Sequence, residues 1–92
     1  MNKSELVAAI AQKADISKRQ AEATLDSTVA TIADALAEGD SVRLVGFGTF
    51  EVRTRAGRTG RDLRTGEVIE IPAMKTPGFK AGKTLKDRVR NI

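Results

Sequence analysis

Apolar residues recur at helical spacing near the beginning of the chain. Leu6 and Ile10 lie four residues apart and share one face of a helix. Asn2 and Glu5 precede and open this segment with the three-residue spacing of a helix-capping pair. The pattern predicts a first helix over about residues 3–14.

A second and longer apolar stripe follows after a short turn. Ser17 and Gln20 repeat the capping spacing, and Gly39 is typical of a helix end. Between them, apolar side chains recur at steps of three and four residues: Ala21, Leu25, Val29, Ile32 and Leu36. The sequence therefore predicts a helical hairpin over residues 1–39.

The pattern then changes to strand periodicity. Val42 and Phe50 belong to two segments in which apolar and polar residues alternate, separated by the turn sequence GFG. Alternation fades into AGRTGRDLRTGE, a basic, glycine-rich segment with almost nothing to bury, and resumes at residues 68–71. We therefore predict a β ribbon that runs out to a tip near residues 60–66 and back. With ~8 residues per strand beyond the body, the ribbon would reach roughly 25 Å at ~3.3 Å per residue.

The last part of the chain carries two prolines and a short helical pattern. We expect the chain to leave the sheet around Pro72 and Pro77, since proline cannot donate to a strand ladder. Leu85 and Val89 share a helical face with Ala81, which predicts a C-terminal helix. The predicted α+β domain thus has a helical hairpin (1–39), a three-stranded antiparallel sheet (40–76) with an arm at about 54–72, and a C-terminal segment and helix (77–92).

A chain this small has few residues with which to build a core. If about twenty residues form the arm, a core built from the rest rarely contributes more than ~3–5 kcal/mol. We therefore predict an obligate dimer in which both chains share one core. A homodimer is the expected form, and a heterodimer with a paralogue is the alternative that the sequence leaves open. The predicted dimer-core residues are Leu25, Val29, Ile32, Leu36, Leu44, Phe47, Phe50 and Phe79.

The net charge of +4 is unevenly distributed along the chain. Residues 1–40 carry four Lys/Arg against seven Asp/Glu, a net of −3, whereas residues 41–92 carry twelve against five, a net of +7. This asymmetry favours a polyanion such as nucleic acid as partner of the second half. A basic surface kept for solubility is the alternative, and charge alone does not decide between them.

The composition argues against several kinds of chemistry. Histidine and cysteine are absent, which removes the commonest metal ligand, the usual general base and any thiolate. The segment GFKAGKT is one residue too short for a phosphate-binding loop. We predict no catalytic residue, no metal, no cofactor and no small-molecule substrate. Without a membrane-length apolar run or a signal-peptide pattern, we expect a cytoplasmic protein.

Arginines follow the predicted arm. Arg53 and Arg55 lie two residues apart, so both point from one face of a strand. Arg58, Arg61 and Arg64 continue the positive charge to the tip. Guanidinium groups bind phosphates and fit a narrow minor groove. A ribbon with its arginines on one side therefore has the width and charge to lie in a groove of a duplex.

Leu63 is the one large apolar residue at the predicted tip. One interpretation is a wedge that enters between base pairs, at a cost of a few kcal/mol per unstacked step. The other is an ordinary exposed loop residue. Composition leaves both open.

The stretch GFGTFEVRTRAGRTGRDLRTGE, followed by IPAMKTPGFKAGKTLKD, resembles the HU and integration host factor family of bacterial histone-like DNA-binding proteins. The resemblance covers the whole chain and is most specific over residues 46–66. It implies an intertwined dimer with two β-ribbon arms that embrace the minor groove of duplex DNA. It further implies DNA bending with little sequence preference, a preference for bent, nicked or gapped DNA, and compaction of the nucleoid.

The resemblance also implies roles for individual residues. The arm residues that would contact DNA are Arg53, Arg55, Arg58, Arg61 and Arg64. The body residues that would contact phosphates are Lys3, Lys75, Lys80, Lys83 and Lys86. The family usually carries Asn-Pro at the tip, where proline is the wedge, whereas this chain has Asp62 and Leu63. Leucine lacks the fixed backbone of proline, and Asp62 adds a negative charge, but we expect DNA bending to persist.

Two other functions remain open at this point. A site-specific DNA-bending factor of the integration host factor type would discriminate strongly between duplex sequences. An RNA-binding or protein-bridging module would not prefer duplex DNA. Phenylalanines that stack on single-stranded bases would support RNA binding, but Phe50 continues the apolar face of a strand, which favours a place in the core.

Overall fold

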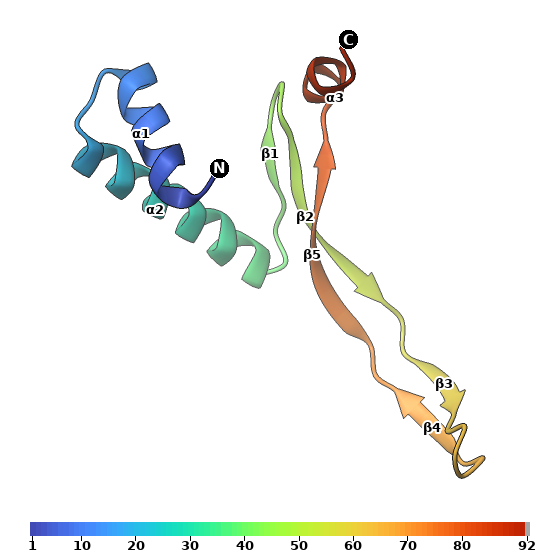
Figure 1. The fold of residues 1–92 in the computed structure, drawn as a ribbon. Coiled ribbons are helices and arrows are strands. Elements are labelled where there is room, and N and C mark those ends of the chain that lie inside the picture. The colour runs from blue at the N-terminus through green and yellow to red at the C-terminus, as the bar shows by residue number, and fades with distance from the viewer. Residues whose placement is uncertain (92) are drawn as a thin grey trace. The chain divides into compact units, whose positions relative to one another are not determined.

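The computed structural model describes residues 1–91 of the 92-residue chain. The chain divides into two compact units, residues 1–35 and the part that begins at Leu36. Figure 1 shows the elements, which are α1 (Lys3–Ala14), α2 (Lys18–Ala37), β1 (Val42–Leu44), β2 (Gly48–Arg55), β3 (Arg58–Arg61), β4 (Val68–Ile71), β5 (Met74–Ala81) and α3 (Lys83–Arg90). The α+β class and the helical hairpin are confirmed.

Side-chain caps begin both helices of the hairpin where the sequence predicts them. Asn2 Oδ1 accepts a hydrogen bond from the Glu5 N–H at 2.9 Å. At α2, Ser17 Oγ accepts from the Gln20 N–H at 3.1 Å while Gln20 Oε1 accepts from the Ser17 N–H at 3.1 Å. These bonds satisfy N–H groups that have no partner within the helix.

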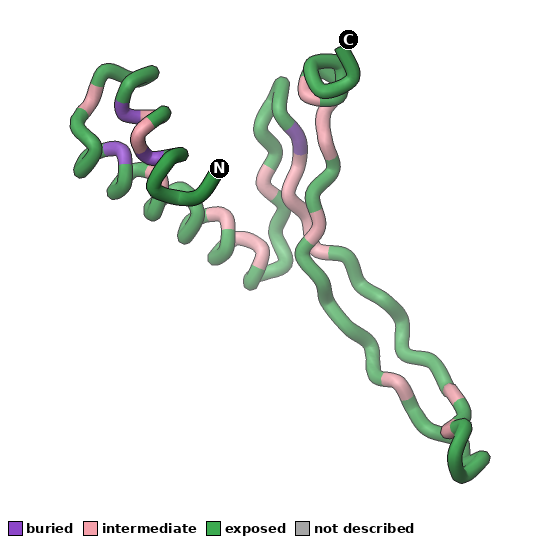
Figure 2. The backbone as a smooth tube through the Cα atoms, in the orientation of Figure 1, coloured by how far each residue is buried: buried purple, intermediate pink, exposed green. Residues whose placement is uncertain are grey.

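The core of the helical unit is small. Val7, Ala11 and Ala21 are buried, and Ile10, Ile16 and Leu25 pack against them. Figure 2 shows the buried positions confined to α1, α2 and the beginning of β2. Val29, further along the apolar stripe of α2, remains 57% exposed. One chain therefore does not bury the whole stripe.

The strands form one long ribbon in a single register. In the three-stranded sheet β1-β2-β5, Gly48 lies opposite Ala81, and in the two-stranded sheet β3-β4, Arg61 lies opposite Val68. All partners between these two pairs follow the same register. The ladder is interrupted only between Arg55 and Arg58, opposite Pro72, which has no N–H to donate. The predicted ribbon arm is thus confirmed as an extension of the sheet.

The expected exit from the sheet at the prolines was wrong. Pro77 lies within β5, opposite Val52, and β5 continues to Ala81. β5 is an edge strand in the order β1-β2-β5, so no further strand pairs with its outer side. A proline in β5 can therefore lack an N–H without breaking a hydrogen-bond ladder on that side. The sheet therefore extends beyond the predicted boundary at residue 76, and Ala81 ends a strand rather than beginning the C-terminal helix.

Three aromatic rings cluster where the sheet meets its first turn. The Phe79 ring lies 5.3 Å from that of Phe47 and 4.9 Å from that of Phe50, measured between centroids. A Cβ on Gly48 would lie 2.5 Å from Phe79 Cζ, so only glycine leaves room for this ring. Phe47 and Phe79 are nevertheless 44% and 38% exposed in the single chain. The cluster is an apolar surface that one chain leaves partly uncovered.

Candidate nucleic-acid interface

The register gives the three-stranded sheet one basic and one apolar face. Arg43 lies opposite Thr49, and Thr49 lies opposite Lys80, so these side chains form one row across the sheet. Arg53 and Arg55 follow Thr49 at even steps and share its face. We call these four charged residues the basic face: Arg43, Lys80, Arg53 and Arg55. The other face carries Val42, Leu44, Phe50, Val52 and Phe79.

Arg43 was missed by the sequence analysis. Its place beside Lys80 depends on which residues pair across β1, β2 and β5, which alternation within one strand does not reveal. Arg43 and Lys80 line an open depression of about 610 Å³ together with Lys83 and Thr84 at the beginning of α3. The depression gathers three cations, and the Glu51 carboxylate also belongs to its lining.

Arg53 is held in place by its neighbours. Its guanidinium lies 3.3 Å from Glu51 Oε1. Its side chain also lies over Gly78, where an added Cβ would approach Arg53 Nε to 2.6 Å. The ion pair is exposed, with 57% of the Arg53 side chain accessible, so it contributes at most ~1 kcal/mol. Arg53 therefore remains available to an incoming phosphate.

The sequence analysis expected the arm arginines to lie on one side of the ribbon, but the structure places them on both sides. Arg58 lies opposite Ile71, and Arg61 lies opposite Val68. The two arginines are three positions apart on β3, so they point to opposite faces of the ribbon. Cationic side chains thus flank the arm on both faces, an arrangement that suits a groove with a phosphate wall on each side.

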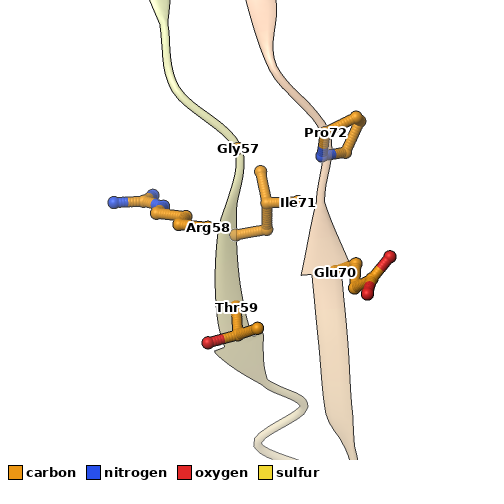
Figure 3. Close-up of a pocket in the computed structure, with 6 residues that line it drawn as sticks. All are labelled: Gly57, Arg58, Thr59, Glu70, Ile71 and Pro72. Atoms are coloured by element: carbon orange, nitrogen blue, oxygen red, sulfur yellow. The ribbon is translucent and has the colours of Figure 1, made fainter.

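The interruption of the ladder leaves an open depression of about 500 Å³ in the arm. Figure 3 shows the lining side chains, with Arg58 pointing away from β4 and Ile71 lying between the two strands. A Cβ on Gly57 would come within 3.2 Å of the Ile71 carbonyl oxygen. The strands are therefore close together at this position although no ladder bond joins them.

The tip of the arm is a short closed loop. The Asp62 N–H donates to the Glu67 carbonyl at 2.8 Å, and the Gly66 N–H donates to the Asp62 carbonyl at 2.7 Å. Gly66 has φ of 74°, which glycine adopts without strain. β3 extends to Arg61, so the tip is shorter than the predicted residues 60–66. The Leu63 side chain is 100% exposed on this loop.

The predicted lysines occupy several places. Lys75 lies opposite Thr54, on the opposite face of the sheet from Arg53. Lys83 and Lys86 are exposed on α3. Lys3 lies in the helical unit, where its Nζ is 2.8 Å from Asp26 Oδ1. The hydrogen bond to Asp26, followed by the charge of the same carboxylate, raises the pKa of Lys3 above its ordinary value.

Within residues 1–91, no group of three His, Cys, Asp or Glu side chains is arranged to hold a metal ion. No helix in the described part of the chain is sufficiently long and apolar to cross a membrane.

Comparison with known proteins adds a family and several relatives. The family model described as bacterial DNA-binding protein matches residues 1–90. DNA-binding protein HU-alpha of Escherichia coli is 56% identical over 98% of this chain and 100% of its own, and DNA-binding protein HU 1 of Bacillus subtilis is 55% identical over 97% of each chain. A cocrystal structure of Anabaena HU with DNA has a TM-score of 0.86 and 49% identity over the full length of both chains. HU from Thermotoga maritima has a TM-score of 0.69 and 36% identity over 98% of this chain.

Proposed function

Because this chain belongs to the family of bacterial DNA-binding proteins, we propose that it is an architectural protein of the HU type. It binds duplex DNA with little sequence preference, and it bends and compacts the DNA through its β-ribbon arm. The named relatives are HU proteins, which favours this function over a site-specific factor of the integration host factor type. It acts in the cytoplasm, on the nucleoid.

The observation that carries this proposal is the charged ribbon. Arg53 and Arg55 lead from the sheet into the arm, Arg58 and Arg61 flank it on two faces, and Leu63 is fully exposed at its tip. Arginines of this kind bind the phosphates that border a minor groove, and an apolar tip can enter a base step. The arm therefore lies along the groove with its tip at a kink.

The apolar surface supports a homodimer. None of the eight predicted dimer-core residues is buried in one chain, and Leu44, Phe47 and Phe79 are each more than a third exposed. Exposed apolar area of this extent marks a surface that another protein covers. A second copy of the chain completes this core and supplies a second arm, so that one dimer holds a bent duplex from two sides. Bent, nicked or gapped DNA is then preferred, because part of the bending cost is already met.

The salt dependence of binding tests the proposed function. Neutralising about six to ten phosphates gives a slope of log affinity against log salt of roughly −5 to −9. Fluorescence anisotropy with linear, nicked and gapped duplexes of random sequence should give that slope, with tighter binding to the nicked and gapped forms. Competition with RNA and with duplexes of other sequences is the control. A slope near zero, or equal competition by RNA, would contradict the proposal.

A further inference from the structure

We propose that Asp62 is a positioning residue for Leu63. Its carboxylate organises the tip loop before DNA arrives and so presents Leu63 in one orientation. The inference rests on the proposed function, because it concerns how the wedge of that function is held. It differs from the sequence-based expectation, in which Asp62 only adds a negative charge near phosphates.

The hydrogen bonds of the tip converge on Asp62. Its Oδ1 accepts from the Arg64 N–H at 2.8 Å, across Leu63. Its own N–H and carbonyl hold Glu67 and Gly66 at 2.8 and 2.7 Å. The side-chain bond therefore closes a small ring around the Leu63 backbone, and the two backbone bonds fix that ring to the end of the ribbon.

The exposure of the neighbouring side chains agrees with this role. Asp62 is half-buried, whereas Leu63 is fully exposed. The hydrogen bond that the Asp62 carboxylate accepts from Arg64 spans only two residues, so it lies within the tip loop. Asp and Asn side chains often accept a hydrogen bond from the backbone N–H two residues later. Such a bond favours one local backbone conformation over the alternatives.

A preformed tip matters because leucine has no fixed φ. A wedge on a mobile loop must be ordered when it enters the base step, and that loss of conformational freedom weakens insertion. By holding the backbone on both sides of Leu63, Asp62 removes part of this cost in the free protein. The effect acts on insertion, while the arginines along the arm continue to bind phosphates.

Two variants separate the acceptor from the charge. Asp62→Ala removes both, whereas Asp62→Asn keeps an acceptor oxygen and removes only the charge. Leu63→Ser, which keeps the loop but removes the apolar group, is the reference for loss of the wedge. Each full-length variant is titrated with a gapped duplex that carries 2-aminopurine beside the gap, whose fluorescence rises when the base unstacks, and separately with a linear duplex.

With Asp62→Ala we expect the equilibrium constant for insertion of Leu63 to fall about threefold to tenfold, as for loss of one hydrogen bond, and the fluorescence rise at saturation to fall with it. Affinity for the linear duplex should change less than about threefold, because no phosphate contact is lost. Asp62→Asn should retain the rise. In the free proteins, hydrogen exchange at the Arg64 N–H should be faster in Asp62→Ala and unchanged in Asp62→Asn.

The outcomes distinguish this inference from the proposed function. A full fluorescence rise with Asp62→Ala, or an equal loss with Asp62→Asn, would overturn the positioning role while leaving DNA binding untouched. If Leu63→Ser leaves the fluorescence rise and the affinity for gapped DNA unchanged, Leu63 is not a wedge, and that part of the proposed function would be wrong.

Discussion

Replacing Arg55, Arg58 and Arg61 together by glutamine, in both arms of the dimer, should weaken binding to linear duplex DNA by about 10⁵-fold at 0.1 M salt. Each phosphate contact contributes about 0.9 to the salt slope, which corresponds to roughly eightfold in affinity at this salt concentration. Because the proposed dimer has two arms, six contacts are lost, which should also make the slope less steep by about 5.4. Fluorescence anisotropy over a salt series measures both quantities.

The control for this variant has the same change in net charge at another place. Lys13, Lys18 and Arg19 are exposed in the helical unit and are not among the predicted DNA-binding residues. Their replacement by glutamine should lower affinity only slightly through the weaker overall field. If both triple variants lose affinity equally, net charge rather than the arm binds DNA, and our assignment of the arm would be wrong.

Phe79→Ala should destabilise the folded protein by about 3–5 kcal/mol, the range for removing a large core ring. Phe79 contacts both Phe47 and Phe50, and its ring occupies space that a side chain at Gly48 would fill. Since we place this cluster in a core shared by two chains, the loss should also promote dissociation of the dimer. Denaturant unfolding at several protein concentrations measures both effects, because a dimer unfolds at a concentration-dependent midpoint.

Val68→Ala is the matched control for Phe79→Ala. Val68 is 66% exposed in the arm, so its truncation should change stability by no more than about 0.5 kcal/mol. A stable folded monomer of the unchanged protein in sedimentation at micromolar concentration would contradict the shared core. So would an unfolding midpoint that does not depend on protein concentration.

The helices could be predicted from the sequence because their starts depend on local contacts. Asn2 with Glu5 and Ser17 with Gln20 act within a few residues of one another, so spacing alone identifies them. The C-terminal strand was missed for the opposite reason. Pro77 disfavours a strand unless the strand lies at an edge, and edge position is a property of the whole sheet.

The arginine faces required the register of the ribbon. Glycines interrupt the alternation between Arg55 and Arg61, so the sequence does not indicate which residues lie opposite one another. The register places Arg58 opposite Ile71 and brings Arg43 into one row with Lys80. The tip was predictable in position but not in its hydrogen bonds, because an Asp side chain in a turn has several possible donors nearby.

The most direct test of the central claim is to remove the arm and measure DNA affinity. Because one register runs through the whole ribbon, replacing residues 57–72 by Asn-Gly should close β2 and β5 with a two-residue turn. We predict that this protein keeps its fold and dimer but binds linear and gapped duplexes at least about 100-fold more weakly at 0.1 M salt. Unchanged affinity in the shortened protein would contradict the claim that the arm holds the DNA.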